Sequence, residues 1–212
     1  LNNNNINEEK IKNILNLFIK DRNFSISPGD NNNKTEKKYP DKPFITSSLQ
    51  LEAQKNHGFS VKKTMTISQN LYENGLITYH RTDSSFICEE FQNKLKDHII
   101  KNYGEKYFQI PDIKKIKGSQ EAHECIRPIS LDISKIDSDK FTDDDIKLYD
   151  LIYKRTVCSY MRPAKYQVNF IKLKNSTTEK IGYFSSKKKY LVFEGFLKTK
   201  NIKIDNNREN FE

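Results

Sequence analysis

The spacing of apolar residues changes once along this chain, at the segment RPAKY, residues 162–166. Before that segment, apolar side chains recur every three or four residues in several stretches, which predicts amphipathic helices. After it, apolar and polar residues alternate in YQVNFIKLK, KIGYFSS and KYLVFEGFLK, which predicts antiparallel strands. The sequence therefore predicts an α+β protein in which a helical body precedes a β-rich tail.

The first 43 residues are expected to contain one helix, one short strand and a polar loop. Ile11, Leu15 and Phe18 share one helical face, and RNFSIS alternates as a strand would. Residues 28–43 are polar and bounded by Pro, which predicts a loop or linker.

Two helices joined by a tight turn are predicted between residues 47 and 75. Ser47 and Gln50 have the spacing of a capping box, and Gly58 is a typical stop for the first helix. One face of the second helix, which should end at Gly75, is expected to carry Val61, Met65, Ser68, Leu71 and Tyr72. The pair has the form of a helix-turn-helix, although such pairs more often only build a core.

The sequence LITY is expected to form a short strand that leaves the second of these helices. A further helix is predicted across residues 84–104, with Ile87, Phe91, Leu95 and Ile99 in register.

A basic loop is expected at residues 105–120, and SQEAHECIRP, residues 119–128, should form a polar turn or a short helix. The last helix is predicted to start at Thr142, with Asp145 at capping-box spacing, and to run through Tyr160.

The charge of the chain favours a polyanionic partner. The 37 Lys and Arg residues outnumber the 28 Asp and Glu residues, which gives a net charge of +9. Nucleic acid fits this charge better than an acidic membrane surface does. A compositional preference for Lys and Asn would explain the same numbers, and composition alone leaves both explanations open.

The cysteine pattern and the hydropathy restrict the environment of the protein. Cys88, Cys125 and Cys158 are odd in number and form no C-x-x-C pair, which argues against a disulfide framework or a zinc site. No apolar run approaches the roughly 20 residues of a membrane span, and no signal peptide is evident. A soluble, intracellular protein without membrane contact is expected, in a compartment that stays open. Because the chain begins without Met, we expect it to be a piece of a longer protein.

The segment GLITYHRTDSS, residues 75–85, carries the most specific chemistry. In an extended segment Tyr79 and Arg81 point to the same side and His80 to the other. A phenol is a poor nucleophile at neutral pH, but a guanidinium beside it stabilises the phenolate and binds phosphate in a bidentate manner. The pair suits attack on a phosphodiester that gives a tyrosyl phosphate ester. A buried Tyr79 beside a solvated Arg81 is the alternative that residue chemistry alone leaves open.

Four blocks occur in an order and at spacings that resemble type IA DNA topoisomerases of the bacterial topoisomerase I and reverse gyrase branch. They are PFITSSLQLEA, GFSVKKTMTISQNLYENGLITYHRTDSS, SQEAHECIRP and YDLIYKRTVCSYMRPAKY. The resemblance covers roughly residues 8–200. It implies a fragment that cleaves single-stranded DNA by transesterification to a 5′-phosphotyrosine, and a complete enzyme that relaxes negative supercoils by strand passage and religation.

The resemblance also assigns roles to residues. Tyr79 matches the nucleophile of the family, Arg81 the arginine that contacts the scissile phosphate, and His123 the histidine near that phosphate. Thr78 and Asp83 are expected to shape the site or to touch DNA.

Further DNA contacts are expected from basic residues. Arg127 should meet DNA or the neighbouring arch. Lys62, Lys63 and Arg162 lie in basic segments interleaved with aromatic rings, as contact with phosphates and stacking on bases require.

The resemblance implies an architecture as well. Residues 43–163 should form a mostly helical, winged-helix-like domain that carries Tyr79, inserted into a β-rich arch made by residues 1–42 and 164–212. The family binds Mg²⁺ through an acidic Toprim domain, which these residues do not supply. The fragment is therefore expected to bind no metal, to need the Toprim and gate domains of the same polypeptide, and to be inactive alone.

Two alternatives remain at this point. The first is a non-catalytic, basic DNA-binding module of the helix-turn-helix type, and the second is an interaction domain whose charge reflects composition. Whether the parent enzyme only relaxes DNA or acts as a reverse gyrase is also open, although the Asn-rich composition does not resemble that of a hyperthermophile.

Overall fold

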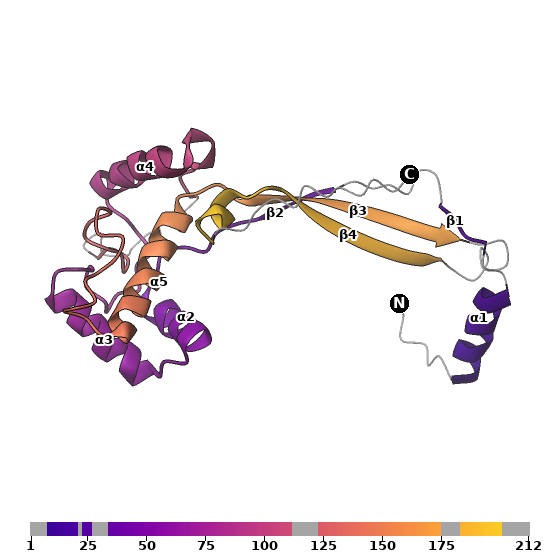
Figure 1. The fold of residues 1–212 in the computed structure, drawn as a ribbon, viewed down its shortest axis with the longest axis horizontal. Helices are drawn as coiled ribbons and strands as arrows, with labels where there is room; N and C mark the ends of the chain where they lie inside the picture. The colour runs from indigo at the N-terminus through magenta and orange to yellow at the C-terminus, as the bar shows by residue number, and fades with distance from the viewer. Residues whose placement is uncertain (1–7, 21–22, 27–33, 112–122, 175–182, 201–212) are drawn as a thin grey trace. The chain divides into compact units, whose positions relative to one another are not determined.

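A computed structural model describes residues 8–20, 23–26, 34–111, 123–174 and 183–200. Helices and strands both occur, so the predicted α+β class is confirmed (Figure 1). The chain divides into two compact units. Unit 1 comprises residues 1–37, 165–192 and 205–212, and unit 2 comprises residues 38–164 and 193–204.

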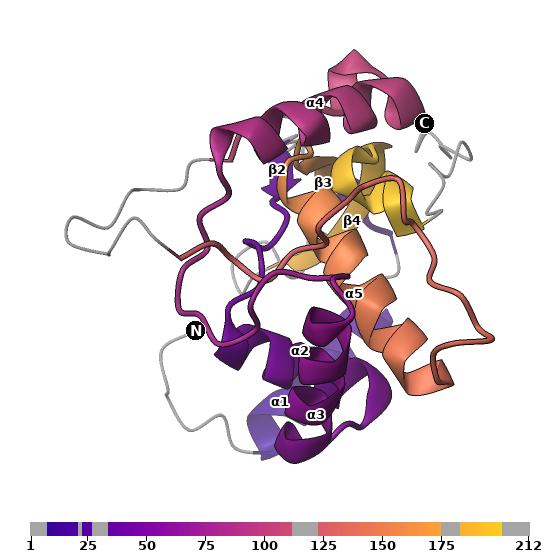
Figure 2. The ribbon, with the colours of Figure 1, turned by 90° about the vertical axis from the view of Figure 1, so that its left-hand side faces the viewer.

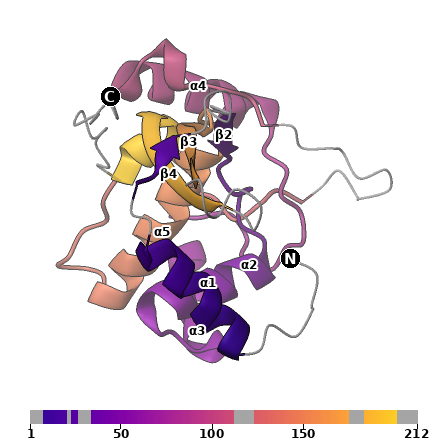
Figure 3. The same cartoon turned by 90° about the vertical axis from the view of Figure 1, so that its right-hand side faces the viewer.

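A four-stranded sheet is the main element of unit 1. Its strands are β1 (Ser25–Ile26), β2 (Lys34–Lys38), β3 (Ala164–Lys174) and β4 (Phe184–Phe193). Strand β3 pairs with each of the other three, and β1 runs antiparallel to it with Ser25 opposite Lys174. The helix α1 (Glu8–Lys20), indigo in Figure 3, also belongs to unit 1, and its Ile11 and Leu15 are exposed.

Strand β2 corrects the prediction of a loop across residues 28–43. Its sequence KTEKK has no apolar residue, so hydropathy gives no strand signal there. Backbone pairing with β3 and ion pairs hold it instead: Glu36 lies 3.0 Å from Lys187 Nζ and 2.6 Å from Lys189 Nζ. The last two predicted strands are one strand in the structure. The described part of KIGYFSS and the residues KYLVF both belong to β4.

Unit 2 contains four α-helices and two 3₁₀ helices among its described residues. They are α2 (Thr46–His57), α3 (Val61–Glu73), α4 (Glu89–Tyr103), η1 (Glu105–Tyr107), α5 (Asp143–Ser159) and η2 (Gly195–Lys200). Figure 2 shows α2, α3 and α5 packed together, and these three contact one another in each pairing. Their shared core includes Leu49, Ala53, Leu71, Leu148 and Ile152, all buried.

The 3₁₀ helix η2 replaces the end of the predicted last strand. Phe196 and Leu197 are buried, and the Phe196 N–H donates to the carbonyl of Arg162 at 2.9 Å. The segment therefore groups with the helical unit, where η2 contacts α5.

Two of the predicted helix caps are confirmed and one is wrong. Thr142 and Asp145 form a reciprocal capping box at the start of α5, and Gly58 ends α2 with a φ of 68°. At the start of α2, however, the Ser48 hydroxyl accepts the Ile45 N–H at 3.0 Å, so Ser47 and Gln50 are not the capping pair. The N-cap is Ile45, two residues before the predicted Ser47, which moves the third helical position from Gln50 to Ser48.

The buried face of α3 differs from the predicted one. Thr64, Ile67, Ser68 and Leu71 are buried, whereas Val61 and Tyr72 are exposed at the margins of that face. The reason is that α3 contacts both α2 and α5, which cover the polar Thr64 and Ser68 along with the apolar residues.

Helix α4 begins at Glu89, five residues after the predicted start at Ser84. The register predicted for it is nevertheless confirmed, because Ile87, Phe91, Leu95 and Ile99 are all buried.

Gly195 should tolerate no side chain, and Gly58 provides a matched control. Both have positive φ, 52° and 68°, but a Cβ on Gly195 would lie 2.6 Å from the Pro163 carbonyl oxygen and closer still to that of Arg162. A Cβ on Gly58 meets nothing within 4 Å. We expect Gly195→Ala to lower the free energy of unfolding by about 3 kcal/mol and Gly58→Ala by about 1 kcal/mol. Equal losses in urea denaturation would contradict the close approach at Gly195.

Candidate active site around Tyr79

The side chains of residues 78–82 alternate between anchored and exposed positions. Tyr79 is 46% exposed and Arg81 is exposed, whereas His80 is 1% exposed. Tyr79 and Arg81 thus lie on the solvent side and His80 on the core side, as an extended segment predicts. The segment is not the strand expected from LITY, because its ladder is a single bridge between Ile77 and Pro128.

Aromatic rings surround Tyr79. The Tyr72 ring, at the C-terminal end of α3, meets it edge to face with centroids 5.2 Å apart, and the His80 ring lies 5.3 Å away. These contacts restrict the phenol ring without covering it.

The exposure of Tyr79 contrasts with other tyrosines of unit 2. Tyr149 and Tyr153 are buried in α5, their hydroxyls donate to backbone carbonyls, and burial raises the pKa of each to about 12. Burial likewise raises the pKa of the Tyr160 phenol. A covered phenol cannot reach an external phosphate, so Tyr79 is the best placed nucleophile of these four tyrosines.

His80 is a buried imidazole without polar partners. Within the part of the chain that the structure describes, neither ring nitrogen has a hydrogen-bond partner. Burial lowers the pKa of His80, and the neighbouring positive charge of Arg81 lowers it further. The neutral ring therefore acts as packing that anchors this side of the segment.

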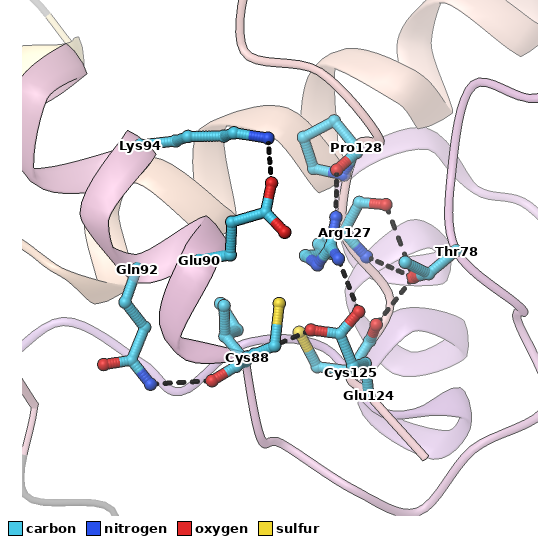
Figure 4. Close-up of polar contacts among 10 residues, drawn as sticks. Thr78, Cys88, Glu90, Gln92, Lys94, Glu124, Cys125, Arg127 and Pro128 are labelled. Carbon is cyan, nitrogen blue, oxygen red and sulfur yellow. Dashed lines mark hydrogen bonds and ion pairs between the residues drawn. The ribbon is translucent and has the colours of Figure 1, made fainter. Parts of the chain in front are cut away.

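Thr78 joins the Tyr79 segment to the segment that carries His123. The Thr78 hydroxyl donates to the carbonyl of Cys125 at 2.6 Å and accepts the Arg127 N–H at 3.0 Å, and the Thr78 N–H donates to the Arg127 carbonyl at 2.9 Å (Figure 4). His123, exposed, lies two residues before Cys125. Two chain segments separated by more than 40 residues are thus held together at the candidate site.

Arg127 is buried and ion-paired, 8% exposed, so the expected contact of its side chain with DNA is not supported. Its guanidinium bonds the carboxylate of Glu124 and donates to the Pro128 carbonyl at 3.0 Å (Figure 4). It also lies 3.9 Å from the centre of the Phe91 ring. A buried guanidinium with these partners orders the segment that contains it rather than contacting a ligand.

Glu124 extends this network to α4. Its second carboxylate oxygen accepts the Cys88 N–H at 2.7 Å, at the residue that precedes the helix. Burial raises the pKa of Glu124, but the hydrogen bonds from Arg127 and Cys88 outweigh that effect and leave its pKa below the usual value. Sequence reasoning did not single out Glu124, although its place beside His123 and three residues before Arg127 was a usable signal.

The other predicted DNA contacts occupy different surroundings. Lys62 and Asp83 are exposed. Lys63 is also exposed but lies 2.5 Å from Asp144 and over the Phe59 ring. Arg162 is exposed, and its Nε–H donates to the carbonyl of Phe108 at 3.2 Å. The structure therefore leaves Lys62 freer for a phosphate than Lys63.

Thr46, the first residue of α2, is a second residue that sequence reasoning did not single out. Its hydroxyl lies 2.8 Å from the His80 carbonyl oxygen and 3.0 Å from that of Thr82. The only sign of it in the sequence is its place inside the block PFITSSLQLEA.

Several known proteins are similar to this chain in sequence and in fold. A family model described as DNA topoisomerase matches residues 2–212. The "DNA topoisomerase 1 type prokaryotic" of Acanthamoeba polyphaga mimivirus is 39% identical over 202 residues, which cover 92% of this chain and 23% of that protein. DNA topoisomerase 1 of Buchnera aphidicola is 44% identical over 161 residues, covering 72% of this chain and 18% of that protein.

A solved structure agrees with these sequence matches. Full-length topoisomerase I from Thermotoga maritima superposes with a TM-score of 0.76 at 29% identity, covering 97% of this chain and 34% of that one. This chain belongs to the DNA topoisomerase family, which confirms the resemblance. It spans about a quarter or less of the length of the curated relatives named above.

The described residues contain neither a membrane-spanning helix nor a cluster of metal ligands. No described helix is long and apolar enough to cross a membrane. No group of three or more His, Cys, Asp or Glu residues in the described ranges could hold a metal ion.

The Glu124–Arg127 pair makes a prediction about stability and pH. We expect Glu124→Gln to lower the free energy of unfolding at pH 7 by about 3 kcal/mol, because Arg127 would be left buried without its counter-charge. The matched control is Glu90→Gln, which removes an ion pair with Lys94 that is exposed to solvent and should therefore leave the stability close to that of the wild type.

The pH dependence has a definite sign. Because folding lowers the pKa of Glu124, its contribution is complete above the usual glutamate value near 4.5 and is lost as the pH falls through the folded-state pKa. The stability difference between wild type and Glu124→Gln should therefore narrow below pH 4.5 in denaturation curves. A constant difference down to pH 2 would contradict the ion pair.

Proposed function

We propose that this chain is the strand-cleaving part of a type IA DNA topoisomerase, with Tyr79 as the nucleophile. The observation that carries the proposal is the presentation of Tyr79 and Arg81 on the solvent side of one anchored segment, in a chain of the topoisomerase family. A reacting phenol must be reachable by a polymer, and a phosphate-binding cation must accompany it. Both conditions are met within three residues.

The proposed reaction is a transesterification. The Tyr79 phenol oxygen attacks the phosphorus of one DNA strand, the bond from phosphorus to the 3′ oxygen breaks, and a 5′-phosphotyrosine forms. The phenol gives up its proton and the departing 3′ oxygen gains one, so the number of phosphodiester bonds is conserved. Reversal by the same groups religates the strand after strand passage, and no high-energy cofactor is consumed.

Arg81 and His123 support this chemistry in different ways. The exposed guanidinium of Arg81 would bind the non-bridging oxygens of the scissile phosphate and neutralise charge that develops there. His123 is exposed on the segment that Thr78 holds against the Tyr79 segment. Its imidazole would bind the phosphate or share a proton near neutral pH.

The proposed DNA contacts are chiefly to single-stranded DNA. Lys62, Lys63 and Arg162 are exposed cations that would contact phosphates, and Asp83 would border the cleavage site. Thr78 would shape the site rather than touch DNA, because its hydroxyl is engaged with Cys125 and Arg127.

The proposed architecture and metal requirement concern the complete protein. Residues 43–163 would form the winged-helix-like domain, and residues 1–42 and 164–212 the two strips of the arch. Among the described residues, no group of three or more His, Cys, Asp or Glu side chains fits a Mg²⁺ site. In the complete enzyme a Toprim domain would hold Mg²⁺, and without it and the gate domain these 212 residues would bind DNA weakly and relax none.

The test of the nucleophile uses the complete enzyme with Mg²⁺ and negatively supercoiled DNA. We expect Tyr79→Phe to abolish both relaxation and the covalent adduct with a single-stranded oligonucleotide. Tyr72→Phe is the matched control, since its exposed phenol lies edge to face against Tyr79, and it should retain both. Relaxation by Tyr79→Phe at the wild-type rate would refute the proposal. A non-catalytic helix-turn-helix module would instead show salt-sensitive DNA binding and no adduct in any variant.

The proposed role of Arg81 can be tested with two substitutions, one that removes its charge and one that keeps the charge but changes the shape of the side chain. We expect Arg81→Ala to slow oligonucleotide cleavage at saturating DNA by about 100-fold or more, in the range seen when a group that stabilises developing charge is removed. Arg81→Lys should recover only part of this loss, because an ammonium keeps the charge but not the bidentate geometry. Full recovery with Lys would show that charge alone matters, and a change confined to DNA affinity would argue against a phosphate contact in the transition state.

A further inference from the structure

We infer that Thr46 is a positioning residue for cleavage: its hydroxyl fixes the backbone of residues 80–82 so that Tyr79 and Arg81 face the DNA. The inference rests on the proposed function of Tyr79. Thr46 itself is half-buried at the start of α2 and touches neither of the outward side chains through its hydroxyl.

Four short contacts join Thr46 to this segment. The Thr46 N–H donates to the Thr82 carbonyl at 2.9 Å, and the Thr82 N–H donates back to the Thr46 hydroxyl at 2.9 Å. The hydroxyl proton has two acceptors in reach, the carbonyls of His80 at 2.8 Å and Thr82 at 3.0 Å. A hydroxyl has one proton, so it donates chiefly across the shorter contact, to the His80 carbonyl, and it also accepts the Thr82 N–H.

The hydroxyl is not needed by its own helix. Of the N–H groups at the start of α2, that of Ile45 donates to the Ser48 hydroxyl at 3.0 Å and that of Thr46 donates to the Thr82 carbonyl at 2.9 Å. In the described structure the Thr46 hydroxyl bonds only to residues 80–82, which lie more than 30 residues away in the sequence. A threonine that merely capped its helix would bond a backbone N–H within the first turn.

The anchor behind Thr46 is rigid. Phe44 and Leu49 on either side are 0% and 1% exposed. Phe44 also pairs with Ile126, whose N–H donates to the Phe44 carbonyl at 2.9 Å. A shift of Thr46 would therefore disturb the core, and the hydroxyl and backbone N–H of Thr46 connect residues 80–82 to that core.

Thr46 provides hydrogen bonds to the backbone on the C-terminal side of Tyr79, which Thr78 and the His80 ring do not provide. Thr78 fixes the segment on the N-terminal side of Tyr79 through Cys125 and Arg127. His80 contributes packing only, because its ring nitrogens have no partners in the described structure. On the C-terminal side, polar anchoring of the backbone on both flanks of Arg81 comes from Thr46, which bonds His80 and Thr82.

The experiment compares Thr46→Val with Thr46→Ser in the complete enzyme. Val keeps the β-branched shape and the backbone N–H but loses the hydroxyl, whereas Ser keeps the hydroxyl. Single-turnover cleavage of a single-stranded oligonucleotide is measured at saturating DNA, together with the Kd for the same oligonucleotide. We expect Thr46→Val to cleave roughly 10- to 100-fold more slowly with an unchanged Kd, since small displacements of reacting groups have effects of this size. Thr46→Ser should stay near the wild-type rate.

Two further measurements separate positioning from folding. Thr156→Val is the matched control, because the Thr156 hydroxyl is buried and bonds only the Ile152 carbonyl of its own helix in the described structure. It should leave the cleavage rate unchanged. Hydrogen exchange of the Thr82 amide should accelerate in Thr46→Val alone. If Thr46→Val does not fold, Thr46→Ala and Thr46→Ser are compared in the same way.

The outcomes that overturn the inference are specific. They are a Thr46→Val enzyme that cleaves at the wild-type rate, a Thr46→Ser enzyme as slow as Thr46→Val, or a loss in Thr156→Val of equal size. Tyr79→Phe is assayed in parallel. If that variant still forms the covalent adduct, the proposed function fails; if it forms none while Thr46→Val cleaves normally, only the role of Thr46 fails.

Discussion

The alternation of anchored and exposed side chains across residues 78–82 is the constraint on which the candidate site depends. Thr78 and His80 anchor the segment on one side of the backbone, and Thr46 holds it from α2. Because the segment is anchored on its core side, the side chains of Tyr79 and Arg81 lie on the solvent side. A loop in general positions side chains less well than a helix or strand, and these anchors from two other segments compensate for the absence of a strand ladder.

The buried charge of Arg127 beside the Tyr79 segment can be explained by the structure around it. The Arg127 guanidinium is expensive to desolvate, and its pairing with Glu124 only offsets that cost. The pair does more for geometry than for net stability, because Glu124 also accepts the Cys88 N–H and the Arg127 backbone N–H donates to the Thr78 hydroxyl. Helix α4, the His123 segment and the Tyr79 segment thus share one polar junction.

The sequence predicted helices well where the periodic pattern coincided with local capping, as at Thr142 and Asp145 of α5 and at Gly58 of α2. It failed where tertiary contacts decided the outcome. Strand β2 has no apolar residue and exists because β3 pairs with it. At the site, the outward direction of Tyr79 and Arg81 followed from the two-residue repeat. The burial of Arg127 and the role of the Thr46 hydroxyl did not, since both depend on partners that lie far away in sequence.

The proposed reaction, if Tyr79 carries it out, requires rigidity at Tyr79 as well as a fast attack. Religation would use the same transition state in reverse, so the proposed phosphotyrosine would have to stay where the 3′ hydroxyl can return to it. A nucleophile on a mobile loop would carry the attached 5′ end away from that position. The ring contact with Tyr72 and the hydrogen bonds of Thr46 and Thr78 restrict the segment that carries Tyr79, while the phenol itself stays exposed to solvent.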